Sequence, residues 1–143
     1  MKAHFLLLSF LLFGLIAKGQ GVVVQGQSEC TVAGSQHGAT IQFESRTLWG
    51  LGIFYQAELG NGHETYIPKD TFLGMLVQAP LATAKRISFF AMLRAGFVNE
   101  NFVVLVPGLE TRVHISPRFG TAFGMSMRMG YAAVSGKLFV KVF

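Results

Sequence analysis

Large apolar residues alternate with small or polar residues over long stretches of this chain. Between Phe119 and Tyr131, every odd position except Thr121 is large and apolar, and every even position is Gly, Ala, Ser or Arg. Alternation of period two is typical of a β-strand, whose successive side chains point to opposite faces. The stretch is longer than an ordinary strand, which has about 5–6 residues. Its length suits a tilted strand that crosses a membrane, which needs about 9–11 residues. It therefore predicts a strand that crosses a bilayer.

Weaker forms of the same alternation predict seven further strands. They are expected at residues 21–27, 39–44, 49–58, 71–80, 87–97, 103–115 and 135–143. An even number of strands is the rule for single-chain bacterial outer-membrane barrels. The pattern therefore predicts an all-β fold, an eight-stranded antiparallel up-and-down transmembrane β-barrel.

Glycine, proline and polar clusters separate these stretches and predict the connections. With both chain ends in the periplasm, the periplasmic turns are expected at Ser45–Thr47, Leu81–Arg86 and Ser116–Arg118. The outer loops are then expected at Ser28–Gly38, Leu59–Asp70, Val98–Asn101 and Ala132–Val134. The polar loop Leu59–Asp70 is the connection best suited to meet a surface partner.

The N-terminus has the organisation of a secretory signal peptide. Lys2 precedes the apolar run Phe5–Ile16, and the small-residue site Ala17-Lys18-Gly19 follows. This run is too short for a spanning helix of about 20 apolar residues. We expect residues 1–19 to be cleaved near Gly19/Gln20 and residues 20–143 to form one barrel domain; an uncleaved anchor is the alternative.

Composition supports an exported membrane protein. Hydrophobic residues make up 51% of the chain and charged residues 13%, yet no later run resembles a spanning helix. A closed β-barrel is the other structure that crosses a bilayer. The formal net charge is +5, but the basic residues are scattered, which argues against a nucleic-acid partner. Cys30 is the single cysteine, expected as a free thiol in a loop, with pairing between chains left open.

The small and polar face of the strands is expected to line the barrel interior. The lumen of an eight-stranded barrel is just wide enough for side chains to fill, and buried charges need partners. We therefore predict a structural polar network inside a filled lumen, rather than a pore. Its charged and titratable members are Glu44, Glu58, Arg94, Glu110, Arg112, His114 and Arg128. Trp49, Tyr55, Phe119 and Tyr131 lie near strand ends, where aromatic residues form interfacial girdles.

Several segments resemble the small outer-membrane β-barrels of Gram-negative envelopes, the OmpA/OmpX-like kind. These are the signal peptide, Gly50–Tyr55, Ile87–Phe97, Pro107–Arg112 and Phe119–Tyr131. The resemblance implies an integral protein of the cell outer membrane, in contact with outer-membrane lipid. One departure concerns the C-terminus. Counting back in twos from Phe143, such barrels tend to be apolar, whereas this chain has Lys141, Phe139, Lys137 and Ser135. Either the last strand points Phe143 inward, or the C-terminus is irregular.

Catalytic and cofactor motifs are sparse. His114-Ile-Ser116 is similar to the His-x-Ser pair of lipid A 3-O-deacylases, but no carboxylate follows to orient the histidine. His37 and His63 have no metal-ligand spacing, and the glycines lie within strands rather than in a phosphate loop. We therefore expect no catalytic, metal or cofactor site, and a non-enzymatic structural or loop-display role. The alternatives are a secreted lipocalin-like carrier of an apolar ligand and a barrel acyl-hydrolase acting on lipid A.

Overall fold

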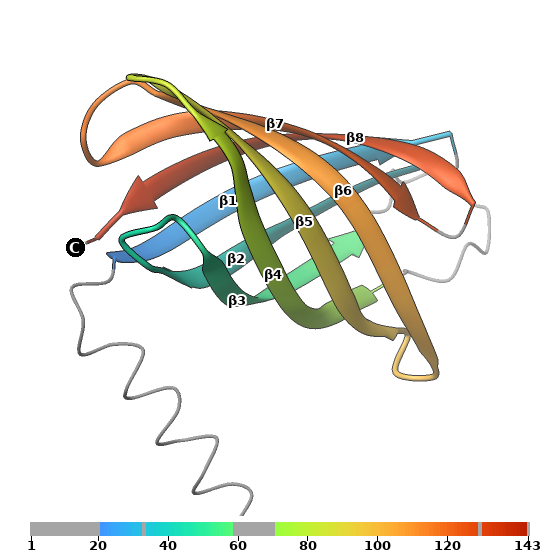
Figure 1. Cartoon of the computed structure of the whole chain (residues 1–143). Coiled ribbons are helices and arrows are strands. Elements are labelled where there is room, and N and C mark those ends of the chain that lie inside the picture. Colours follow the sequence, from blue (N-terminus) through green and yellow to red (C-terminus); the bar gives the residue numbers. More distant parts are fainter. Residues whose placement is uncertain (1–20, 33, 59–70, 129, 143) are drawn as a thin grey trace, which may run out of the picture.

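The computed structural model describes residues 21–32, 34–58, 71–128 and 130–142, which form one closed barrel (Figure 1). Each strand pairs antiparallel with the next, and β8 pairs with β1 to close the sheet. The strands are β1 Gly21–Thr31, β2 Gly34–Glu44, β3 Gly50–Glu58, β4 Thr71–Thr83, β5 Ile87–Val98, β6 Phe102–His114, β7 Phe119–Arg128 and β8 Tyr131–Lys141. The expected eight-stranded up-and-down barrel is confirmed. The expected signal peptide, the loop Leu59–Asp70 and Phe143 lie outside the described residues.

The barrel has two distinct ends. At the terminal end, β1 begins beside the end of β8, and three connections join β2 to β3, β4 to β5 and β6 to β7 (Figure 1). At the loop end, β1, β3, β5 and β7 finish. Asn99 and Glu100 there have φ of 50° and 62°, and the Asn101 N–H donates to the Val98 carbonyl at 3.2 Å. Positive φ at both central residues is the hairpin geometry that matches strand twist.

Two expected loops and one expected turn are wrong in extent. Residues 28–38 are largely paired, because β1 and β2 run in register from Gly21↔Glu44 to Thr31↔Gly34. Residues 132–134 lie in β8 and pair with β7. β4 continues to Thr83 through a register shift at Pro80, which has no N–H to donate.

Cys30 consequently lies in β1 with its side chain exposed, and not in a loop. The error has a physical cause. Close to the barrel ends, outward positions such as Ser28 and His37 are polar, so the alternation that marks a strand disappears from the sequence.

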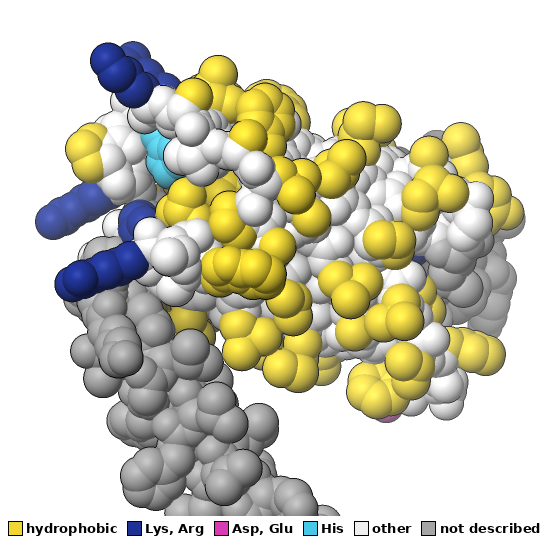
Figure 2. Space-filling model, viewed as in Figure 1, with side chains coloured by type: hydrophobic (Ala, Val, Ile, Leu, Met, Phe, Trp, Pro, Cys, Tyr) yellow, Lys and Arg dark blue, Asp and Glu magenta, His cyan; other side chains and the backbone are white. Residues whose placement is uncertain are grey.

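The distribution of apolar side chains is inverted relative to a soluble protein. On β7, Phe119, Phe123 and Met125 are exposed, whereas Ala122 and Arg128 are buried. The same division holds around the barrel, and Figure 2 shows the apolar side chains spread over its flank. In the part of the chain described above, no helix is long and apolar enough to span a membrane.

Two apolar clusters interrupt the polar interior. The larger consists of Phe54, Phe72, Leu76, Met92, Val98 and Val106, on β3 to β6; the smaller consists of Val23, Ala122 and Phe139. Inward glycines make room beside the larger cluster. Gly74 pairs with Gly96, and a Cβ at Gly96 would lie 2.2 Å from the Leu73 carbonyl oxygen. No side chain larger than the hydrogen of glycine fits where these two residues of β4 and β5 pair.

Candidate functional site: the polar lumen

Arg112 is the centre of a charged group in the half of the lumen nearer the terminal end. Its Nε donates to Glu110 Oε1 at 2.7 Å, and its Nη1 donates to Glu44 Oε2 at 2.6 Å. Its Nη2 donates to Gln78 at 2.5 Å, so every guanidinium nitrogen has an acceptor. The guanidinium also lies 4.7 Å from the ring centroid of Phe90, within cation–π range. The side chain is thus fixed on all sides.

Two lysines complete this group. Lys137 Nζ donates to Glu110 Oε2 at 2.5 Å, and Lys141 Nζ donates to Glu44 Oε1 at 2.9 Å. Each carboxylate therefore bridges Arg112 and one lysine. Three cations and two anions are joined in a chain across β2, β6 and β8. Because four of these five side chains are almost completely buried, their mutual pairing offsets the cost of removing them from water.

A ladder of glutamines extends this group across the barrel. Gln25 Nε2 donates to Gln42 Oε1, and Gln42 Nε2 donates to Gln78 Oε1, both at 3.4 Å. Gln78 in turn accepts from Arg112. The ladder links β1, β2, β4 and β6 through side chains, in addition to the backbone pairing of neighbouring strands.

A second charged group lies nearer the loop end, around Arg94. Arg94 Nη2 donates to Glu29 Oε2 at 2.6 Å and to Ser126 Oγ at 3.0 Å, and Nη1 donates to Gln56 at 3.0 Å. Arg128 donates to Gln36 and lies 4.9 Å from the centroid of the Phe72 ring. These contacts span opposite walls, so the interior is filled by interlocking side chains.

The seven predicted network residues occupy three kinds of position. Glu44, Glu110 and Arg112 lie together in the first group, and Arg94 and Arg128 lie on the other side of the glutamine ladder. Glu58 is half-buried at the end of β3, and no ion pair joins it to another described residue. His114 is half-buried at the end of β6, where its ring packs edge-on against Phe139 at 5.3 Å.

Three charged members of the lumen lie outside the predicted network: Glu29, Lys137 and Lys141. Glu29 falls within the expected outer loop Ser28–Gly38, but in the structure the inward series Val23, Gln25, Gln27 of β1 continues directly to it. In β8 the inward face is Ser135, Lys137 and Phe139, opposite the exposed Leu138 and Val140. The polar residues that interrupt the expected apolar face of the C-terminal strand thus include Lys137, which binds the carboxylate oxygen of Glu110 that Arg112 does not use.

The His114-Ile-Ser116 pair has no catalytic geometry. Ser116 Oγ accepts from the backbone N–H of Arg118 at 3.3 Å and of Phe119 at 3.0 Å, which fixes the turn between β6 and β7. His114 faces the Phe139 ring, and no hydrogen bond joins it to Ser116 in the described structure. Within residues 21–32, 34–58, 71–128 and 130–142, no group of three or more His, Cys, Asp or Glu side chains could hold a metal.

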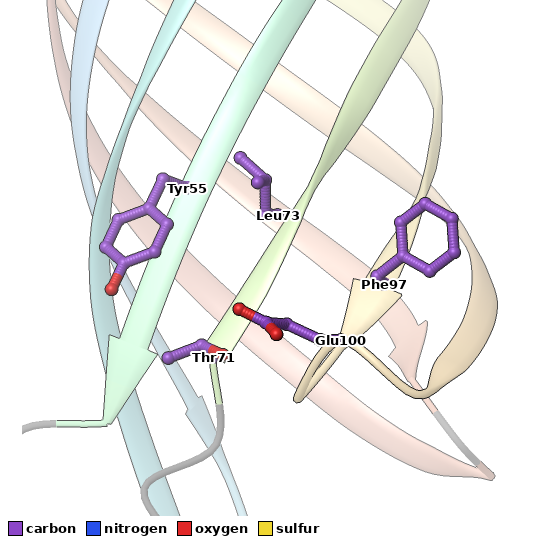
Figure 3. Close-up of a pocket in the computed structure, with 5 residues that line it drawn as sticks. All are labelled: Tyr55, Thr71, Leu73, Phe97 and Glu100. Atoms are coloured by element: carbon purple, nitrogen blue, oxygen red, sulfur yellow. The ribbon is translucent and has the colours of Figure 1, made fainter.

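A groove of about 370 Å³ lies near the loop end on the outer wall (Figure 3). It is lined by Tyr55, Thr71, Leu73, Phe97 and Glu100. Tyr55, Leu73 and Phe97 are outward-facing residues of β3, β4 and β5, so the groove belongs to the apolar flank rather than to the lumen.

Comparison with solved structures identifies the same architecture elsewhere. A computationally designed transmembrane β-barrel matches with a TM-score of 0.68 and 10% identity, over 85% of this chain and 95% of the design. The fold is that of transmembrane β-barrels. Neisserial surface protein A matches with a TM-score of 0.50 and 9% identity, over 85% of this chain and 95% of that protein. Ail of Yersinia pestis, in complex with the heparin analogue sucrose octasulfate, matches with a TM-score of 0.50 and 13% identity, over 87% and 97%.

The natural neighbours are eight-stranded outer-membrane barrels. No protein-family model matches the sequence, and no curated protein matches it. At 9–13% identity, the structural match shows a shared fold and nothing more. The lipocalin-like alternative is not favoured, because the large apolar side chains face outward and the interior is occupied by charged and amide groups.

Proposed function

We propose that this chain is an integral, non-enzymatic barrel of the bacterial outer membrane, of the small OmpA/OmpX-like kind. The observation that carries the proposal is the inverted distribution of side chains. Soluble monomers rarely expose contiguous apolar patches above a few hundred Å². Here each described strand exposes at least one large apolar side chain, and β3 to β8 expose several each, so hydrocarbon is the solvent that suits the flank of the barrel.

Two further features support a membrane position. Trp49 and Phe119 are exposed at the terminal end, and Tyr55 and Tyr131 are exposed in the half nearer the loop end. Aromatic residues at both ends of an apolar band are typical of the two membrane–water interfaces, and the rings of Trp and Tyr are amphipathic. The eight described strands form a closed sheet in which each strand pairs with a neighbour on both sides, whereas an open sheet has edge strands that the hydrocarbon region does not tolerate.

The filled lumen argues for a structural or loop-display role rather than for transport. Arg112, Phe54 and Phe72 are fully buried inside it, and the ion pairs of Arg94 and Arg112 cross-link its walls. Such an interior stiffens the barrel and holds its connections in place. The loop Leu59–Asp70 is the connection proposed to reach a surface partner.

Membrane fractionation with sodium carbonate tests the location. The native chain is expected to remain in the outer-membrane pellet, and an unheated sample should migrate differently from a boiled one on a gel. Release by carbonate alone, or identical migration before and after boiling, would contradict the proposal. A second variant separates the structural role from the loop-display role. In it a short glycine-rich turn replaces residues 60–69, and it should still fold and keep the gel shift. If this variant restores envelope integrity to a strain that lacks the gene, the role is structural. If it does not, the loop carries the role.

A further inference from the structure

Exposed cations surround the terminal end of the barrel. Arg46 lies in the turn between β2 and β3, Lys85 and Arg86 lie between β4 and β5, and Arg118 lies between β6 and β7. All four side chains are exposed, and Figure 2 shows Lys and Arg side chains projecting from this end. Each of the three turns therefore carries at least one positive charge.

No exposed carboxylate balances these charges at the terminal end, as far as the described residues show. Glu44 and Glu110, the nearest acids, are buried and bonded to Arg112 and to lysines inside the lumen. The exposed acid Glu100 and the half-buried Glu58 lie at the loop end. Among the described residues, the terminal end thus carries a ring of positive charge that no exposed acidic side chain offsets, although the basic residues are scattered in the sequence.

The ring lies directly beside the edge of the apolar flank. In the first turn, the Ser45 N–H donates to the Trp49 carbonyl at 2.8 Å, so Arg46 and the exposed Trp49 share one tight turn. In the third turn, Arg118 lies between the exposed Ile115 and Phe119. Cations that lie next to exposed apolar or aromatic residues suit the depth of a bilayer at which acyl chains meet phosphate headgroups.

We propose that this cationic ring binds anionic phospholipid headgroups in the leaflet at the terminal end of the barrel. The inference rests on the proposed membrane location, and it adds a lipid preference to one rim. A Lys or Arg near an anionic membrane surface contributes about 1 kcal/mol, which corresponds to about fivefold enrichment of an anionic lipid over a neutral one. Screening by salt should weaken the preference.

Trp49 is the only tryptophan of the chain, so it reports on lipids around the turn of Arg46. The refolded barrel is reconstituted in phosphatidylcholine vesicles that contain a fixed minor fraction of brominated lipid, which quenches tryptophan on contact. Brominated phosphatidylglycerol should quench Trp49 several-fold more efficiently per molecule than brominated phosphatidylcholine. High salt should reduce the difference.

Single substitutions make the test local. Arg46→Gln should remove most of the preference at Trp49, and Arg46→Lys should keep it, because the point charge remains. Arg118→Gln removes the same charge from a turn between other strands, so it is the matched control and should change the preference at Trp49 little. The gel shift of each variant confirms that it has folded.

Equal quenching by the two brominated lipids in the native barrel would overturn the inference while leaving the membrane location intact. An equal loss in Arg46→Gln and Arg118→Gln would also overturn it, because the preference would then come from net charge rather than from headgroup contacts. Binding of the ring to a soluble acidic protein, without any lipid preference, would count against it in the same way. Absence of quenching by either lipid would instead contradict the proposed membrane location.

Discussion

Replacement of Arg112 by Met should destabilise the barrel strongly. The substitution keeps a long flexible side chain but removes three donors, which lie 2.5 to 2.7 Å from Gln78, Glu44 and Glu110. Removal of one partner from a buried ion pair costs about 3–5 kcal/mol, because the remaining charge is left without compensation. Here each carboxylate keeps a lysine, Lys137 or Lys141, so the low end of that range is expected.

Urea titration of the refolded barrel in lipid vesicles, followed by Trp49 fluorescence, measures this loss. Arg118→Met is the matched control, since Arg118 is exposed in a turn, and it should change stability by less than about 0.5 kcal/mol. A loss below about 1 kcal/mol for Arg112→Met, which is the size of a surface ion pair, would refute the reasoning.

A second substitution tests the cause. In the Arg112→Met background, Glu44→Gln removes a carboxylate that has already lost its strongest donor. It should therefore cost less there than in the native chain, with a coupling energy of about 0.5–3 kcal/mol. Additive losses would mean that the two residues do not act as a pair.

Three further outcomes follow from the same structure. Leu109→Arg, at an exposed position within β6, should lower the free energy of unfolding in vesicles by about 2–4 kcal/mol. Ile115→Arg, at the barrel end, should lower it by only about 0–1 kcal/mol, and equal losses would argue against a lipid-facing flank. Gly96→Ala should destabilise the barrel by about 1–3 kcal/mol because its Cβ would meet the Leu73 carbonyl, whereas Gly136→Ala, which has open space, should be nearly neutral in the same urea titration. Cysteine labelling in a Cys30→Ser background tests the orientation, in which the terminal end faces the periplasm. Val32→Cys at the loop end should react with a membrane-impermeant maleimide on intact cells, and Thr47→Cys at the terminal end should react only after lysis. The reverse labelling would contradict this orientation.

The fold was predictable because one physical demand acts on almost every residue of a strand. Lipid on one side and a narrow lumen on the other impose strict alternation, and Phe119–Tyr131 displays it clearly. Three apolar residues, Phe54, Phe90 and Met92, face inward and depart from this alternation. Phe54 and Phe90 lie within cation–π range of Arg94 and Arg112, and Met92 packs in the larger apolar cluster. Alternation in polarity cannot distinguish such residues from lipid-facing ones, because both are apolar.

The ends of the strands were less predictable, and this hid part of the site. Outward positions near the interfaces meet headgroups and water rather than acyl chains, so Ser28 and His37 carry no apolar signal. Glu29 was missed for this reason. The position of Lys137 stays open in the sequence, because the face that β8 turns inward depends on its register with β1 and β7. That register is a property of the closed sheet and not of the local sequence.

Contact between the barrel flank and acyl chains is the central claim, and NMR of the deuterated, methyl-labelled protein in detergent micelles measures it directly. Nuclear Overhauser effects from detergent acyl protons should reach the methyl groups of the outward Leu109, Met125 and Leu138, and should be absent at the inward Leu76 and Met92. Effects at Leu76 and Met92 with none at the outward residues would show that the apolar flank does not face lipid, and would contradict the account.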